Sequence, residues 1–148
     1  MIINQQGLLK AAPIKNMVTE KLRFKGFSWG LTECGYDIRI KQRIVLFPGY
    51  RFALGSSMEE FDMPNFLMGR ILNKSTWARL GIDASMTTNI EPGWKGFLTI
   101  ELHYMKTWPI VIPAGVGIAQ VIFEEVCTPA LYKGKYQNQE DKPVPPRR

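Results

Sequence analysis

The sequence predicts a single all-β domain, a sandwich or barrel with a short N-terminal helix. Short β-prone runs recur along the chain, Pro-Gly and Pro-Ala-Gly turns separate several of them, and 148 residues suffice for one domain with a buried core. This spacing of short strands and turns is typical of antiparallel sandwiches and barrels. We therefore expect one domain that spans residues 1–148.

Seven runs of residues predict the strands. The clearest is 36–41, in which Tyr36, Ile38 and Ile40 alternate with polar residues in the period of two that marks a half-buried strand. The strands are expected at 36–41, 44–47, 50–54, 66–72, 97–104, 108–112 and 116–123.

Two helical segments and a polar tail complete the expected organisation. Residues 7–22 carry a loose helical pattern, which predicts a short N-terminal helix with a break near Pro13. A second short helix is expected, with Ser75 as its N-cap and Gly81 as its C′ residue. The tail from about residue 134 is expected to be a flexible arm, with last residues that pack no core.

Composition limits the classes of partner. The formal net charge of +6 indicates an anionic partner, and because the charge is spread along the chain, a nucleotide is favoured over nucleic acid. No apolar run approaches the roughly 20 residues of a membrane helix. The N-terminus also lacks a basic segment followed by an apolar one. We therefore expect a cytoplasmic protein with no membrane partner.

The cysteine and histidine count excludes one class of metal site. Cys34, Cys127 and His103 are the only such residues, and no Cys-x-x-Cys pair occurs. Zinc nucleobase deaminases need a His or Cys ligand beside a Glu, together with a Cys-x-x-Cys pair. If this chain deaminates a base, we expect it to do so without zinc.

The segment around the second helix carries a candidate anion site. A helix N-terminus presents free N–H groups and a partial positive charge, to which Lys74, Ser75 and Thr76 add an ammonium and two hydroxyls. In a helix, Ser75 and Arg79 lie on one face and would address one pocket. The segment fits a phosphate cradle, although a capped helix with an exposed arginine is the simpler explanation of the spacing alone.

A second polar segment surrounds the Pro92-Gly93 turn. Such a turn exposes backbone groups that would read the edge of a base, and Trp94 offers a flat face for a sugar or base. A hairpin turn beside a core tryptophan is the simpler alternative. The side chains concerned are Thr87, Thr88, Asn89, Glu91 and Trp94.

Glu101 is the most conspicuous carboxylate in a predicted strand. The period of two places it on one face with Phe97 and Thr99. A carboxylate on an otherwise apolar strand face is unfavourable to bury unless it is paired. A functional role and an ordinary cross-strand salt bridge explain Glu101 about equally well.

Six short motifs occur in a fixed order along the chain. They are CGYDIRI at 34–40, FALG at 52–55 with Met63-Pro64, the segment 69–81, IEPGWKG at 90–96, GIAQVIFE at 117–124 and KYQNQ at 135–139. Together they resemble the dCTP deaminase family, a branch of the dUTPase-like proteins. Each motif alone is weak, but six in order at compatible spacing are specific, and they cover the chain from about residue 33 onward.

The resemblance implies a fold, an assembly and an activity. The fold would be the distorted jelly roll of the dUTPase-like β-clip proteins, assembled as a homotrimer with active sites at subunit interfaces. The activity would be hydrolytic deamination of dCTP to dUTP and ammonia, with Mg²⁺ on the nucleotide phosphates and no zinc. A hard cation on phosphate oxygens needs few protein ligands.

The resemblance also implies roles for individual residues. Glu101 occupies the position of the family's catalytic Glu and would activate water for attack on cytosine C4, then shuttle protons. Arg79 would favour the ionised carboxylate, Ser75 would position the water, and Trp94 would pack on the deoxyribose. The other implied substrate contacts are Lys74, Thr76, Gln120, Lys135 and Gln139 at the phosphates, Thr87, Thr88 and Asn89 near the base, Glu91 at the sugar, and Tyr132.

The chain departs from the family pattern at two expected substrate contacts, and several alternative functions are compatible with the sequence. Lys74 stands where an Arg is usual, and Glu91 where an Asp is usual. The nearest alternative is a bifunctional enzyme that gives dUMP and pyrophosphate. A plain dUTPase is disfavoured by Glu101. A non-catalytic dUTPase-like nucleotide-binding regulatory protein is a less favoured alternative, and a nucleic-acid binder is the least favoured.

Overall fold

The protein is mainly β, as the sequence predicts. The computed structural model describes all residues from Met1 to Arg148. The elements are β1 (Ile2–Ile3), α1 (Gln5–Ala11), β2 (Lys21–Phe24), β3 (Phe27–Leu31), β4 (Tyr36–Arg39), β5 (Ile44–Leu46), β6 (Phe52–Asp62), β7 (Leu67–Asn73), α2 (Ser75–Arg79), β8 (Ile82–Asp83), β9 (Lys95–Tyr104), β10 (Ile110–Ile112) and β11 (Gly117–Glu125). Neither helix is long and apolar enough to cross a membrane.

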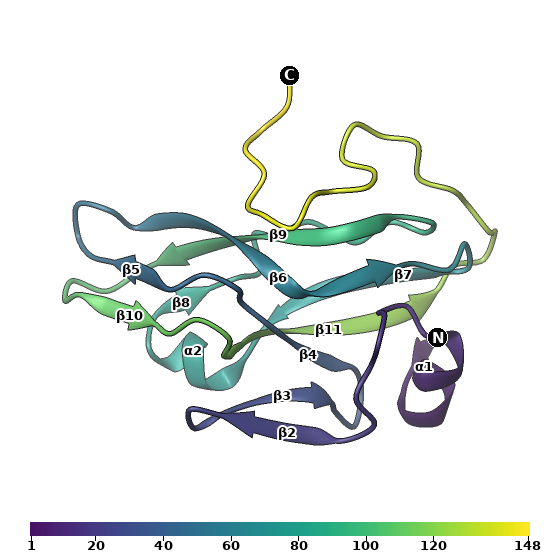
Figure 1. Cartoon of the computed structure of the whole chain (residues 1–148), viewed down its shortest axis with the longest axis horizontal. Helices are drawn as coiled ribbons and strands as arrows, with labels where there is room; N and C mark the ends of the chain where they lie inside the picture. Colours follow the sequence, from purple (N-terminus) through teal and green to yellow (C-terminus); the bar gives the residue numbers. More distant parts are fainter.

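The strands form three groups. The six-stranded sheet has the order β1-β11-β4-β3-β2, and β7 also pairs with β11, which makes β11 its centre. A three-stranded sheet has the order β6-β9-β8, and β5 pairs with β10 at one end of the molecule (Figure 1). The segment after β11 runs back over β9 (Figure 1).

One continuous hydrophobic core holds these groups together. Along β9, Leu98, Ile100, Leu102 and Tyr104 point into it, while the residues between them are only half-buried. The core cluster contains 28 buried residues drawn from almost every strand. Burial of this apolar surface is the main stabilising contribution to the fold, and it fixes which face of β9 remains available for a site.

The sequence predictions of the seven strands are confirmed, with one large difference in length. The run expected at 50–54 is the start of β6, which continues to Asp62 and shifts register against β9 between Ser56 and Glu60. The strands β1, β2, β3 and β8 were not predicted. Two of them are only two residues long, too short to give a periodic signal.

The N-terminal helix exists but is shorter than its sequence pattern. It ends at Ala12, whose left-handed backbone (φ 48°) closes the helix just before Pro13. The loose helical pattern beyond Pro13 does not form helix, because Lys21–Phe24 forms β2 and pairs with β3. Lys25 and Gly26, both at positive φ, make the tight turn between these strands, in the backbone conformation that hairpins favour.

The second helix is confirmed, with a corrected N-cap. Lys74, in an extended conformation, is the N-cap, and Ser75 is already the first helical residue. Leu80 is the C-cap, so Gly81, at a φ of +91°, takes the C′ position as predicted.

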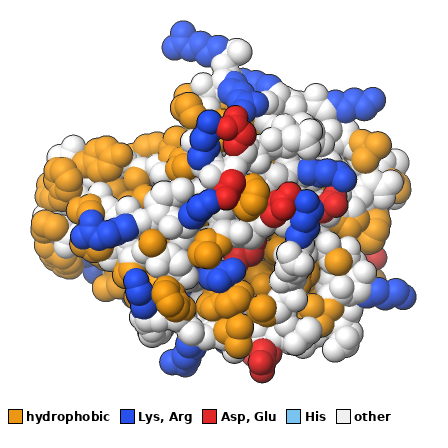
Figure 2. All heavy atoms as spheres, viewed as in Figure 1, with side chains coloured by type: hydrophobic (Ala, Val, Ile, Leu, Met, Phe, Trp, Pro, Cys, Tyr) orange, Lys and Arg blue, Asp and Glu red, His pale blue; other side chains and the backbone are white.

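Charged and apolar side chains are distributed differently over the surface. Lys and Arg are scattered over the face shown in Figure 2 and do not gather in one patch. Hydrophobic side chains gather at the left end of this view, over β5 and β10 (Figure 2). Phe47, Tyr50, Trp108 and Val111 are among the large exposed apolar residues of the chain.

Candidate active site

A cavity of about 620 Å³ lies between the β6–β9 surface and the C-terminal arm. Its size is in the range of small-molecule sites. Of the residues expected to touch substrate, it is lined by Thr88, Asn89, Glu91, Trp94, Glu101, Tyr132 and Gln139. Its other lining residues are Phe52, Leu54, Ile90, Leu98, Thr99, Tyr136, Val144 and Pro146. A mainly apolar wall with a few polar groups is thus the setting of Glu101.

Glu101 projects from β9 into this cavity. Its strand neighbour on β6 is Leu54, and its side chain makes no hydrogen bond or ion pair within the chain, so the salt-bridge explanation of this carboxylate is not supported. Burial raises the pKa of Glu101 above the ordinary carboxyl value. A half-buried carboxyl whose pKa is raised toward neutrality is suited to accept and return a proton.

Trp94 fixes one wall of the cavity to the arm. The side chain is only 5% exposed, and its ring packs against Phe61 with centroids 6.0 Å apart. Its Nε1–H donates to the Tyr136 carbonyl at 2.7 Å. Nearby, the Phe97 N–H donates to the Gln139 carbonyl at 3.1 Å, which docks the arm along β9.

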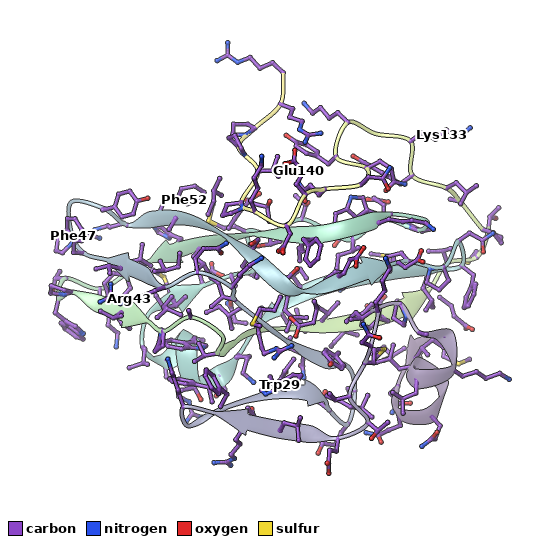
Figure 3. All side chains as sticks on the ribbon, in the orientation of Figure 1. Trp29, Arg43, Phe47, Phe52, Lys133 and Glu140 are labelled. Atoms are coloured by element: carbon purple, nitrogen blue, oxygen red, sulfur yellow. The ribbon has the colours of Figure 1, made fainter.

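The end of the arm closes the cavity from above. The Val144 N–H donates to Thr99 Oγ1 at 3.0 Å, and the Val144 side chain is 7% exposed. The expectation that the last residues pack no core is therefore wrong at Val144. Figure 3 shows Phe52 on the arm side of β6, below the stretch that carries Glu140.

The α2 residues lie outside this cavity. Ser75, Thr76 and Arg79 are exposed, and no ion pair joins Arg79 to Glu101 within one chain. The helix is anchored instead by Trp77, whose Nε1–H donates to the Gly117 carbonyl at 2.7 Å. The expected single pocket for Ser75, Arg79 and Glu101 is thus not formed by one copy of the chain.

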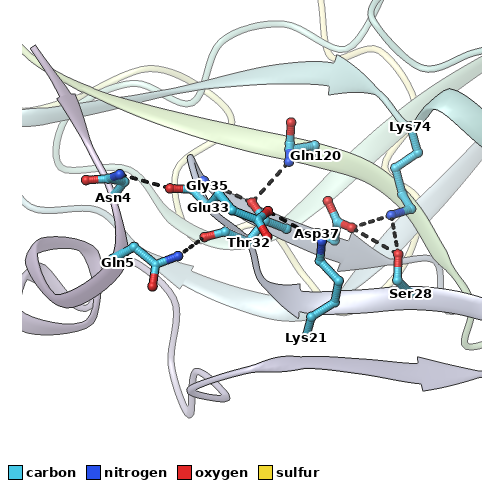
Figure 4. A network of polar contacts seen from close by, with 10 residues as sticks. All are labelled: Asn4, Gln5, Lys21, Ser28, Thr32, Glu33, Gly35, Asp37, Lys74 and Gln120. Atoms are coloured by element: carbon cyan, nitrogen blue, oxygen red, sulfur yellow. Dashed lines mark hydrogen bonds and ion pairs between the residues drawn. The ribbon is translucent and has the colours of Figure 1, made fainter.

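Lys74 and Gln120 belong to a separate polar network (Figure 4). The Lys74 ammonium is ion-paired with Asp37 and donates to Ser28 Oγ at 3.0 Å. The Lys74 side chain is 11% exposed, so its charge is largely committed to a buried carboxylate. Gln120 donates to Thr32 Oγ1 at 3.1 Å in the same network.

Two further expected contacts occupy different places. Lys135 is an exposed residue of the arm whose ammonium contacts the Arg147 carbonyl and lies 5.4 Å from the Tyr136 ring centroid. Thr87 is buried beside Glu101 and does not line the cavity. No three His, Cys, Asp or Glu side chains come together as a metal-binding group.

The apolar half of the cavity was not predicted from the sequence. Phe52 and Leu54 are two residues apart on β6 and therefore lie on one face of the strand. Phe52 is opposite His103 on β9, and Leu54 is opposite Glu101. Their period of two was visible in the sequence, but the register that brings them to Glu101 was not. Val144 and Pro146 gave no signal at all, because their position depends on contacts with β9.

The chain is similar to known proteins over most of its length. Residues 34–126 match the dCTP deaminase-like family. A dCTP deaminase of Roseiflexus castenholzii is 35% identical over an alignment 167 positions long, covering 90% of each chain. A dCTP deaminase of Campylobacter curvus is 34% identical over an alignment 182 positions long, covering 94% of this chain and 97% of that protein.

Solved structures show the same fold at lower identity. A mutant of the dUTPase from Staphylococcus aureus phage phi11, whose structure shows the coordination of a structural Mg(II) ion, superimposes with a TM-score of 0.59 at 18% identity, covering 82% of this chain and 92% of that chain. A dCTP deaminase of Agrobacterium tumefaciens gives 0.59 at 18% identity, covering 82% of this chain and 47% of that chain. The distorted jelly roll of the dUTPase-like proteins, expected from the motifs, is confirmed.

Proposed function

The chain belongs to the dCTP deaminase-like family, and we propose that it hydrolyses dCTP to dUTP and ammonia without zinc, as a cytoplasmic enzyme of deoxynucleotide metabolism. The observation that carries this proposal is Glu101, a carboxyl with a raised pKa in a cavity of nucleotide size. Sequence relatives named dCTP deaminase support the same reaction.

Glu101 is the proton carrier of the proposed reaction. Its ionised carboxylate removes a proton from a water molecule, and the resulting hydroxide attacks C4 of the cytosine. The protonated carboxyl delivers this proton to N3. It then takes up the proton of the hydroxyl now bound at C4 and passes it to the departing amino group, which leaves as ammonia as the C4 carbonyl forms. Because apolar side chains such as Leu54 and Leu98 exclude most solvent, the proton stays between the reacting groups.

The cavity offers separate surfaces for base and sugar. Thr88 and Asn89 lie on the loop beside Glu101 and present polar groups to the edge of the base. Trp94 supplies an apolar face and Glu91 a carboxylate for the deoxyribose hydroxyl. From the arm, Tyr132 and Gln139 complete the wall and are positioned to contact the nucleotide.

A second copy of the chain completes the site in this proposal. Ser75 and Arg79 are exposed on α2, away from the cavity, so they reach Glu101 only from a neighbouring subunit. We expect a homotrimer in which α2 of one copy faces the cavity of the next. There Ser75 would position the water, and Arg79 would favour the ionised state of Glu101.

Except for Gln139, the expected phosphate contacts lie outside the cavity wall. Thr76 and Lys135 are exposed and available to a triphosphate, and Gln120 is half-buried. Lys74 is the least suited, because Asp37 already neutralises its charge. The cavity carries only two carboxylates, Glu91 and Glu101, which fits a Mg²⁺ ion held mainly by phosphate oxygens. Mg²⁺ would neutralise part of the phosphate charge.

A product assay tests the function. The purified protein is incubated with dCTP and Mg²⁺, and dCTP, dUTP and dUMP are separated by ion exchange while ammonia is measured. We expect dUTP and ammonia to accumulate in equal amounts. Direct formation of dUMP and pyrophosphate would replace this proposal with the bifunctional reaction. No conversion of dCTP would contradict deamination and favour a nucleotide-binding protein.

A further inference from the structure

The backbone N–H of Glu101 lies where its neighbouring strand has ended. β9 runs between β6 and β8, but β8 pairs only Ile82 with Tyr104 and Asp83 with His103. After Asp83 the chain leaves the sheet, so no strand carbonyl lies opposite the Glu101 N–H on this side. A buried N–H left without an acceptor would destabilise the fold.

Thr87 supplies the missing acceptor. Its Oγ1 accepts the Glu101 N–H at 2.8 Å, and the residue is 5% exposed. Its own N–H donates to the Ala84 carbonyl at 3.1 Å, and the Ala84 N–H donates to Asn73 Oδ1 at 2.7 Å. The loop that carries Thr88 and Asn89 is therefore fastened to β9 at the residue whose carboxylate enters the cavity.

We propose that Thr87 is a positioning residue, which fixes Glu101 and the loop residues Thr88 and Asn89 at one spacing through a single hydrogen bond. The inference rests on the proposed role of Glu101. Thr87 was expected to touch substrate, but its side chain is turned away from the cavity and committed to the backbone.

The chemistry makes this spacing consequential. A proton carrier works only within about 2.6–3.2 Å of the atoms it serves. A displacement of about 1 Å costs on the order of 100-fold in rate. Without the Thr87 hydroxyl, β9 and the loop are joined at this point only by side-chain packing, so the base edge and the carboxylate are free to move apart.

The chain contains a matched control for this bond. Ser57, a fully buried residue of β6, accepts the Leu98 N–H through Oγ at 2.9 Å, also in place of a backbone carbonyl. It acts on β9 three residues before Glu101 but does not hold the loop and does not line the cavity. Ser57→Ala thus removes the same kind of hydrogen bond from the same strand.

The test compares Thr87→Val, Thr87→Ser and Ser57→Ala by steady-state kinetics with dCTP. Valine keeps the shape of threonine and removes the acceptor, so we expect kcat to fall by about 10- to 100-fold with a smaller change in KM. Thr87→Ser keeps the hydroxyl and should retain kcat within about threefold. Ser57→Ala should lose stability while keeping kcat within about threefold. Should Thr87→Val fail to fold, Thr87→Cys, with its weak acceptor, takes its place.

Two results would overturn the inference. One is a Thr87→Val enzyme with unchanged kcat, and the other is an equal loss of kcat in Ser57→Ala, which would indicate general loosening of β9. Amide hydrogen exchange separates this inference from the proposed function. If the wild-type protein releases no ammonia, the function fails, whereas faster exchange at Glu101 in Thr87→Val but not in Ser57→Ala still identifies the positioning bond.

Discussion

At the scale of single residues, Glu101 is suited to proton transfer but lowers the stability of the fold when it is ionised. Its side chain has no partner within the chain, and burial raises its pKa, so the folded protein holds this proton more tightly than the unfolded chain does. Ionised Glu101 therefore destabilises the fold at pH values above the raised pKa. This destabilisation decreases as the pH falls below the raised pKa, and it is absent below the ordinary carboxyl pKa, where the folded and unfolded states are both protonated. A half-buried carboxyl with no partner and a raised pKa is typical of a functional site.

Glu101→Gln separates the two effects. The amide cannot carry the proton, so deamination should fall by about 10²- to 10⁴-fold. Because glutamine is neutral, the melting temperature should equal or exceed that of the wild type at pH 7–8, and the difference should shrink at acid pH. Activity assays and thermal unfolding across this pH range check both. A variant that is less stable at neutral pH would indicate that a group outside the chain, such as Arg79 of a neighbouring copy, compensates the charge of Glu101.

At the scale of elements, the C-terminal arm is a wall of the cavity and not a loose tail. Two hydrogen bonds join it to β9, from Phe97 to Gln139 and from Val144 to Thr99. A third joins Tyr136 to Trp94, the residue just before β9. Val144 and Pro146 face the same space as Glu101. The arm therefore sets both the shape of the cavity and how much water reaches the carboxyl.

Deleting residues 143–148 should open this wall. We expect KM for dCTP to rise by about tenfold, because the base loses part of its apolar contact. The acid limb of the kcat/KM profile should move to lower pH, since better hydration lowers the pKa of Glu101. Arg148→Ala, which leaves the wall in place, is the control. A fall in KM would mean that the tail competes with substrate for the cavity.

At the scale of the whole molecule, one copy of the chain holds only part of the proposed machinery. The cavity has Glu101 and Trp94, whereas Arg79 and Ser75 lie on the exposed α2. A closed, symmetric assembly repeats the same contact around its axis, so every cavity would receive one α2. The exposed apolar end around β5 and β10 is surface available for contact between copies.

Mixing two inactive variants tests this arrangement. Glu101→Gln and Arg79→Ala should each be inactive alone, and subunit exchange between them should recover activity. With random mixing at equal amounts, about a quarter of the sites would receive both wild-type residues from their two copies. Size-exclusion chromatography with light scattering shows whether trimers form. No recovery despite exchanged subunits would place Arg79 and Glu101 in the same copy or remove Arg79 from the reaction.

Local chemistry made several features predictable from the sequence alone. Alternation with a period of two located β4 and β9 and placed Glu101 on one face with Phe97 and Thr99, because side-chain direction in a strand depends only on position. The Pro92-Gly93 turn and the Gly81 helix end followed from backbone preferences of single residues. The ordered motifs predicted the family and its fold.

Only the tertiary structure decided how these pieces meet. β8 is two residues long and is defined by its pairing with β9. Because β8 ends at Asp83, the Glu101 N–H donates to the Thr87 hydroxyl and not to a strand carbonyl. Lys74 forms an ion pair with Asp37, and Val144 is buried over Thr99. In each pair the two residues are far apart in the sequence. The physical reason is that periodicity and turn preferences act between neighbours along the chain, whereas strand register, buried ion pairs and arm docking are set by contacts between distant segments.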